Sequence, residues 1–161
     1  MYILIYATKK IYIDIYIMPI STKYIMPISI NQFGGQPPKN VADINTTCFR
    51  YKCQVQIYHW QTKSFSRHKA ADELLGALDN FLDTFTEVYM GRYGRPDFAA
   101  GTNIPISNMN DAQASAFLDE MVNYFTNEVP KYLDAKDTDL FNIKDEILAG
   151  INKVKYLFTL V

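Results

Sequence analysis

Helical periodicity between His68 and Tyr89 is the feature of this chain that most constrains its fold. At about 100° per residue, one side of the stretch collects only apolar side chains. A helix with one apolar face must bury that face against other elements, which predicts a helical bundle. The apolar face consists of Leu74, Leu75, Leu78, Phe81, Leu82, Phe85 and Tyr89.

Three further stretches carry apolar residues at the same helical spacing. The first covers about residues 41–62. The third helix follows Asn108 or Asn110 as its cap, and the last helix follows Asp137 or Thr138 as its cap. The chain therefore predicts an all-α protein of four amphipathic helices. The expected core residues are Ile44, Cys48, Tyr51, Val55 and Tyr58 in the first helix, Ala114, Phe117, Leu118, Met121, Phe125 and Tyr132 in the third, and Leu140, Ile143, Ile147, Ile151, Val154 and Phe158 in the last.

The connections between these helices differ in length. Residues 63–65 predict a short turn with Ser66 as the N-cap of the second helix, which ends around Gly91. Residues 92–110 hold several glycines and prolines and suit a crossover along the length of a bundle. Such a crossover makes the second and third helices parallel, so we expect a ferritin-like four-helix bundle. Pro130 lacks a backbone N–H and should kink or end the third helix.

The N-terminal part of the chain differs from the rest. Residues 1–40 predict an irregular or extended leader and linker, and residues 41–161 the bundle. The leader alternates Tyr and Ile and repeats the block Tyr-Ile-Met-Pro-Ile-Ser. Two interpretations are open: translation of an AT-rich DNA repeat upstream of a true start at Met18 or Met26, or an arm that is disordered or binds a partner. Its charged residues leave no apolar run long enough to span a membrane, and it shows no ordinary signal peptide.

Polar residues on the second helix form a stripe turned away from its core face. His68 and Asp72 lie one helical turn apart, and Asp83 and Glu87 repeat that spacing, so each pair is half of a metal site. The two pairs are about 16 Å apart at 1.5 Å per residue, whereas metal ligands lie about 2 Å from their ion. A shared metal therefore needs a second copy of the helix, antiparallel across a two-fold axis. The alternative is a solvated helix face.

With His59-Trp60 before it, this spacing resembles the ferroxidase signature of the Dps-type mini-ferritins. The resemblance implies iron ligands His59, His68 and Asp72 from one chain and Asp83 and Glu87 from a two-fold-related chain. It also implies oxidation of Fe(II) to Fe(III) and iron storage in a dodecameric homo-oligomer. Trp60 would supply an electron to oxidising intermediates, and the alternative is that Trp60 is a packing residue. The interval between the two histidines is about three residues shorter than that family usually has. The chain is also similar to an uncharacterised family of large algal DNA viruses and phages.

Composition limits the remaining possibilities. The net charge of −1 and the pI near 6.1 argue against strong binding to duplex DNA. The third and fourth predicted helices contain no histidine, which excludes the intrachain di-iron site of larger ferritins. Cys48 and Cys53 are expected as reduced thiols in a cytoplasmic protein. Two other functions stay open: a structural or virion protein without a competent site, and a bundle that holds zinc without redox turnover.

Overall fold

The computed structural model describes residues 40–160, all of whose regular structure is helical. The predicted leader lies outside these residues, except for Asn40. No helix in residues 40–160 is both long and apolar enough to cross a membrane. The four main helices are α2 (Ala42–Gln61), α3 (Phe65–Tyr93), α4 (Asp111–Asn123) and α5 (Thr138–Leu157).

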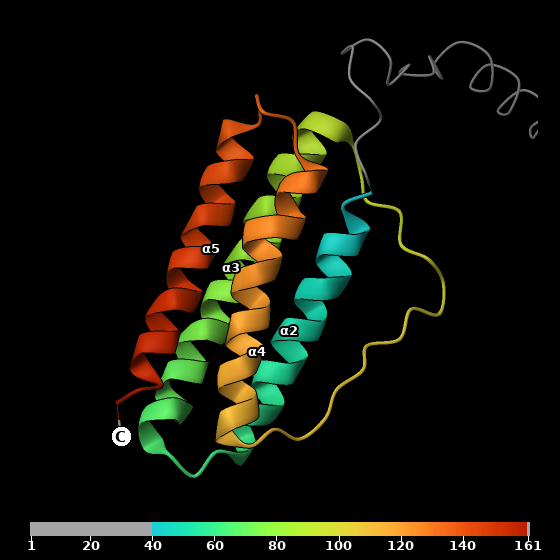
Figure 1. Ribbon diagram of the computed structural model, residues 1–161. Helices are drawn as coiled ribbons and strands as arrows, with labels where there is room; N and C mark the ends of the chain where they lie inside the picture. Colours follow the sequence, from blue (N-terminus) through green and yellow to red (C-terminus); the bar gives the residue numbers. More distant parts are fainter. Residues whose placement is uncertain (1–39, 161) are drawn as a thin grey trace, which may run out of the picture. The chain divides into compact units, whose positions relative to one another are not determined.

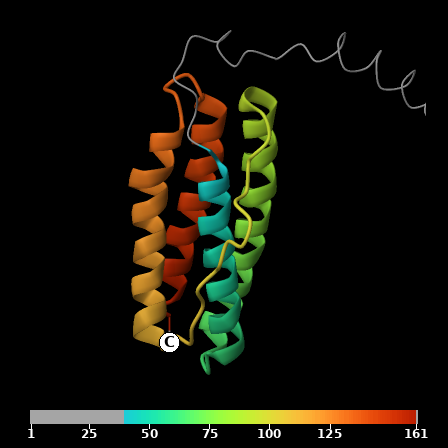
Figure 2. The same ribbon diagram turned by 90° about the vertical axis from the view of Figure 1, so that its right-hand side faces the viewer.

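The helices form a bundle in which α2 and α5 run in one direction and α3 and α4 in the other (Figure 1). The parallel pair is joined by the long crossover of residues 94–110, which follows the length of α2 (Figure 2). The buried Gln54 amide fixes the crossover, because it donates to the Ser107 carbonyl at 2.5 Å and accepts from the Ser107 N–H at 3.0 Å. The predicted bundle and crossover are thus confirmed.

The core is made of the apolar stripes that the periodicity predicts. Nearly all of the expected core residues are buried, and Tyr132 and Ile143 are partly buried against them. Cys48 lies in this core, where burial raises the pKa of its thiol; Cys53 is half-buried, and both thiols are free. The bundle therefore buries the apolar side of α3 and leaves its opposite side outside.

One predicted cap is wrong. Helix α3 begins at Phe65, and the side chain of Ser64 accepts from the Arg67 N–H at 3.3 Å as the N-cap. The Ser66 hydroxyl instead donates to the Leu160 carbonyl at 2.8 Å, tying the start of α3 to the C-terminal end of the bundle. The helix starts two residues earlier than expected, because Ser64 fits the capping position as well as Ser66 does.

The third helix loses its regular form before Pro130, as predicted. After α4 the chain continues as a π-helical turn, Tyr124–Glu128, and a 3₁₀ turn, Val129–Tyr132. The Val129 N–H bonds the Tyr124 carbonyl, five residues back, just before the proline that cannot donate. At the other end Asn110 and Gln113 form a capping box, which decides between the two predicted cap residues.

Candidate metal site

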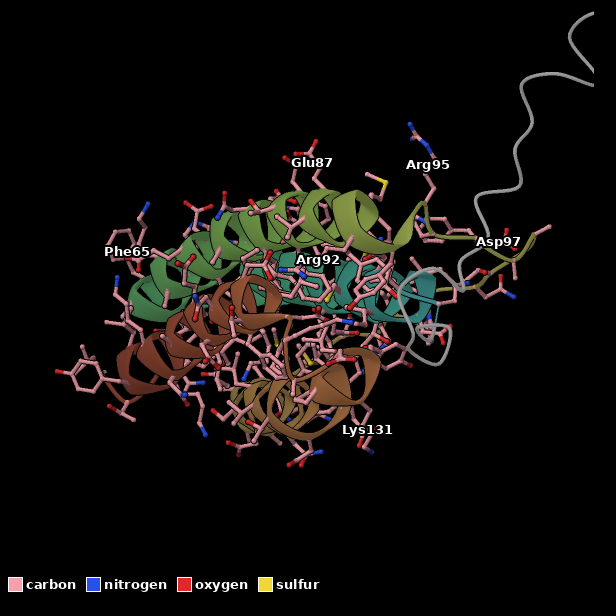
Figure 3. All side chains as sticks on the ribbon, turned by 90° about the horizontal axis from the view of Figure 1, so that it is seen from above. Phe65, Glu87, Arg92, Arg95, Asp97 and Lys131 are labelled. Atoms are coloured by element: carbon pink, nitrogen blue, oxygen red, sulfur yellow. The ribbon has the colours of Figure 1, made fainter. Side chains whose placement is uncertain are left out.

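The predicted ligand stripe lies on the outer surface of α3. This helix packs against α2 and α5, and Asp72, Asp83 and Glu87 are exposed. Figure 3 shows Glu87 pointing away from the other helices, with Phe65 at the start of the same helix. A Cβ added at Gly76, near the middle of the stripe, would meet nothing within 4 Å. The face is therefore accessible to a partner along its length.

His59 at the end of α2 and His68 near the start of α3 stack directly on each other. Their ring centroids are 3.9 Å apart with an interplanar angle of 24°. His59 Nδ1 donates to the His68 carbonyl at 3.1 Å, and His68 Nδ1 donates to the His59 carbonyl at 2.9 Å. Because a carbonyl oxygen can only accept, both rings carry their proton on Nδ1. A neutral ring then offers the Nε2 lone pair, the arrangement typical of metal-ligating histidines.

The stacked rings do not converge on one ion. A ligated metal lies in the plane of the imidazole, about 2 Å from the nitrogen. With ring centroids 3.9 Å apart and planes tilted by only 24°, the two planes meet about 9 Å from the rings, so a single ion reaches one Nε2 at a time. Joint ligation by His59 and His68 requires one ring to turn and give up its bond to a carbonyl, at a cost of about 1 kcal/mol.

The carboxylates of the stripe lie in two separate places. His68 and Asp72 share one turn of α3, and the Asp72 carboxylate is 3.6 Å from the Lys69 ammonium. Asp83 and Glu87 lie further along the same helix. Within residues 40–160 no group of three His, Cys, Asp or Glu side chains comes together to hold an ion. The described residues of one chain therefore form no complete ligand set, and the predicted site would need a second chain.

A network that sequence analysis missed supports the turn beneath the histidines. The Tyr58 hydroxyl donates to Asp111 at 2.8 Å, and Arg67 donates to the Asp111 carbonyl at 3.0 Å and lies over the Phe158 ring at 4.8 Å. Burial raises the pKa of Tyr58, with hydrogen bonds from Thr62 and Arg67 opposing the shift. The network joins α2, α3 and α4 and so holds the two histidines at a fixed turn. In the sequence, only the position of Tyr58 on the apolar face of the first helix gave any indication of this network.

Trp60 lies at the surface of the part of the chain that the structure describes. Its side chain is 69% exposed, and the neighbouring Phe65 is 79% exposed. The end of α2 thus turns this side chain away from the core of the bundle. The turn presents two aromatic rings to solvent instead.

Residues 59–158 match a family whose description is "Family of unknown function (DUF5856)". The chain belongs to this family. The region that matches DUF5856 begins at His59 and contains all five predicted ligands. A stretch of 37 residues is 46% identical to the "Uncharacterized 14.6 kDa protein in mobD-ri intergenic region" of Enterobacteria phage T4. That stretch covers 23% of this chain and 29% of the phage protein, and no solved structure matches the chain.

Proposed function

We propose that this protein is a Dps-like iron-binding protein that oxidises Fe(II) at a site shared by two chains. One chain contributes His59, His68 and Asp72, and the other contributes Asp83 and Glu87. The observation that carries the proposal is the bond from His68 Nδ1 to the His59 carbonyl, which leaves His68 Nε2 as the metal-binding nitrogen one helical turn from Asp72; His59 joins the same ion only after its ring turns and gives up its own bond to a carbonyl. Asp72 lies one turn from His68 on an exposed helix face.

The geometry of an antiparallel pair supports the shared site. If two α3 helices cross so that Asp72 lies opposite Asp83 of the partner subunit, His68 lies opposite Glu87 of the partner subunit. Facing carboxylates repel each other unless a cation lies between them. A bound iron ion would offset that repulsion, and the two-fold axis would generate the same site twice.

The residues divide the work by their chemistry. Imidazole nitrogen suits Fe(II), and the hard carboxylate oxygens favour the Fe(III) product. Each Fe(II) gives up one electron to dioxygen or hydrogen peroxide as the oxidant. Trp60 follows His59 directly in the chain, and its exposed ring can deliver an electron to a strong oxidant beside the site.

A second candidate function is structural. The stacked histidines do not converge on one ion, which fits a role in which they only tie α2 to α3 through their two hydrogen bonds to carbonyls. Similarity to a phage protein agrees with a component of a virus particle. A zinc-binding bundle without turnover would use the same ligands.

Anaerobic titration with Fe(II), followed by air or peroxide and ultraviolet detection of Fe(III), tests the proposal. We expect saturable binding near one or two irons per chain and oxidation well above that in buffer. Asp83→Asn and Asp72→Asn should each lose oxidation while the helical fold survives.

Mixing the two variants provides the internal control. In a hybrid pair one of the two sites combines an intact Asp72 with an intact Asp83, so part of the activity should return. Asp119→Asn, an exposed carboxylate on α4, is the matched control and should oxidise iron normally. Wild-type activity in both single variants would contradict the shared site and favour the structural role.

A further inference from the structure

We propose that a groove between α2, α4 and the end of the crossover binds a small carboxylate with an apolar, ring-sized body. None of the residues that line this groove belongs to α3, so the proposal does not depend on the iron site. It goes beyond Fe(II) oxidation because it assigns a second ligand to the chain. The lining residues on which the argument depends are Arg50, Pro105, Ile106, Ser107, Met109 and Phe117.

The size and composition of the groove suit one small ligand. Its volume is about 300 Å³, at the lower end of the range for ligand sites in proteins, and it is open to solvent on one side. Pro105, Ile106 and Met109 of the crossover and Phe117 of α4 provide apolar surface. An apolar ring bound against them leaves water, and the Met109 thioether makes favourable contacts with aromatic rings. The walls therefore favour a ring over a polar ligand.

Hydrogen bonds from α2 fix the wall that the crossover forms. Figure 2 shows the crossover running along α2 to the start of α4. The Gln54 side chain bonds both the N–H and the carbonyl of Ser107, and the Gln61 amide donates to the Asn108 side chain at 2.7 Å. The capping box of Asn110 then holds the junction with α4. Because the wall is in place before a ligand arrives, binding costs little ordering of the chain.

Arg50 gives the groove its preference for an anion. Among the described residues that line the groove, Arg50 is the one that carries a charge. The crossover from Phe98 to Asn110 has no charged side chain at all. The guanidinium carbon lies 4.9 Å from the centre of the Tyr51 ring and 5.5 Å from that of Phe117. Packing against two rings reduces the hydration of the guanidinium, so its charge acts more strongly on a bound anion.

The guanidinium of Arg50 keeps donors for a ligand although it has partners within the chain. Arg50 Nη2 donates to Glu120 on α4, and the Tyr51 hydroxyl also bonds the guanidinium. A guanidinium carries more N–H donors than these two partners use, and a carboxylate binds two of them side by side. The Glu120 side chain is 49% exposed, so water weakens its ion pair and a ligand can share the guanidinium. The charge of Glu120 nevertheless opposes a bound anion, which gives the proposal a second test.

Titration of the full chain with naphthalene-2-carboxylate near neutral pH tests the site. We expect calorimetry to show one ligand per chain, and amide NMR spectra to show shifts of the Ser107 N–H and the Gln54 side-chain signals. Naphthalene-2-carboxamide has the same ring without the charge. It should bind at least about tenfold more weakly, because a hydrogen bond between two charged groups is stronger than one to a neutral amide.

Opposite changes of charge beside the groove should act in opposite directions. Arg50→Gln should weaken binding of naphthalene-2-carboxylate about tenfold, whereas Glu120→Gln should strengthen it by a few-fold. Lys52→Gln on α2 and Asp119→Asn on α4 are the matched controls. They remove equal charges from the same two helices outside the groove, in ion pairs with Asp79 and Lys155, and should change the affinity little.

A variant of the apolar wall tests the site independently of Arg50. Ile106→Ser should weaken binding about three- to tenfold, whereas Ile104→Ser, two residues earlier in the crossover, should not. Circular dichroism shows whether each variant keeps its helices. Absence of binding, equal affinity for the carboxylate and the carboxamide, or an affinity that neither Arg50→Gln nor Ile106→Ser lowers would overturn the proposal. None of these measurements involves iron, so their outcome is separate from that of the Fe(II) titration.

Discussion

Asp137 provides the sharpest test of what stabilises the bundle, because its carboxylate is completely buried where the end of α3 meets the start of α5. The Tyr93 hydroxyl lies 2.6 and 2.7 Å from its two oxygens, and the Asp134 N–H donates to it at 2.8 Å. Arg92 lies 3.4 Å away and forms a bidentate pair with Asp139. The carboxylate is thus the shared acceptor for groups on both sides of the junction.

Replacing Asp137 with Ala should destabilise the protein by about 3 kcal/mol. The change leaves the Tyr93 hydroxyl and the Asp134 N–H without their acceptor, and each buried unsatisfied group costs about 1–3 kcal/mol. Asp137→Asn preserves the volume and one acceptor oxygen, so it should cost about 1–2 kcal/mol. Arg92 keeps its partner Asp139 in both variants, which limits the penalty for an unpaired charge.

Urea unfolding followed by circular dichroism measures the difference. With a slope of about 1.5 kcal/mol per molar urea, the Ala variant should lower the midpoint by about 2 M and the Asn variant by about half as much. Asp119→Ala, which removes an exposed carboxylate, should change it little. Equal midpoints for the Asp137→Ala and Asp119→Ala variants would refute the assignment of Asp137 as the acceptor at this junction.

Three other predictions concern the cap, the alkaline limit and the exposed tryptophan. Asn110→Ala removes the capping box of α4 and should cost about 1 kcal/mol in urea unfolding, whereas Asn80→Ala on the exposed face of α3 should have little effect. Burial and the charge of Asp137 raise the pKa of Tyr89 to about 12 from 10, so its contribution is complete below pH 10 and is lost as pH rises through 12. Between pH 10 and pH 12 the free energy of unfolding should therefore fall by about 1.4 kcal/mol per pH unit because of Tyr89. Tyr89→Phe should reduce this fall, and an unchanged dependence of the unfolding free energy on pH would contradict the prediction. Fluorescence of Trp60, the only tryptophan, should resemble that of a solvent-exposed indole and be quenched freely by iodide; a blue-shifted, protected emission would disprove its exposure.

The architecture could be predicted because its determinants are local. The buried face of each helix can be recognised from apolar residues that recur about every 3.6 residues. Pro130 and the glycines of the crossover mark where helices stop. Choices between equivalent local signals were not predictable. Ser64 and Ser66 are both good caps, and only the bond from Ser66 to Leu160 at the far end of the chain shows why Ser66 serves elsewhere. Asp137 likewise reads as a helix cap from sequence, yet its side chain makes no capping bond and accepts from Tyr93 instead.

The candidate site shows the same division between local spacing and tertiary arrangement. Helical spacing correctly predicts that the carboxylates share an outward face of α3, since that depends only on residues along one helix. It cannot give the orientation of the two imidazoles, which depends on a turn that brings the end of α2 against the start of α3.

The stacking of the two imidazoles affects how iron could bind. Iron binding through both histidines must first break a carbonyl hydrogen bond worth about 1 kcal/mol. His59→Ala would then weaken Fe(II) binding less than His68→Ala, because His68 has Asp72 beside it on the same helix. Equal losses would indicate that one ring turns so that both histidines ligate one ion, and a larger loss for His59 would place the metal nearer to α2 than to Asp72 on α3.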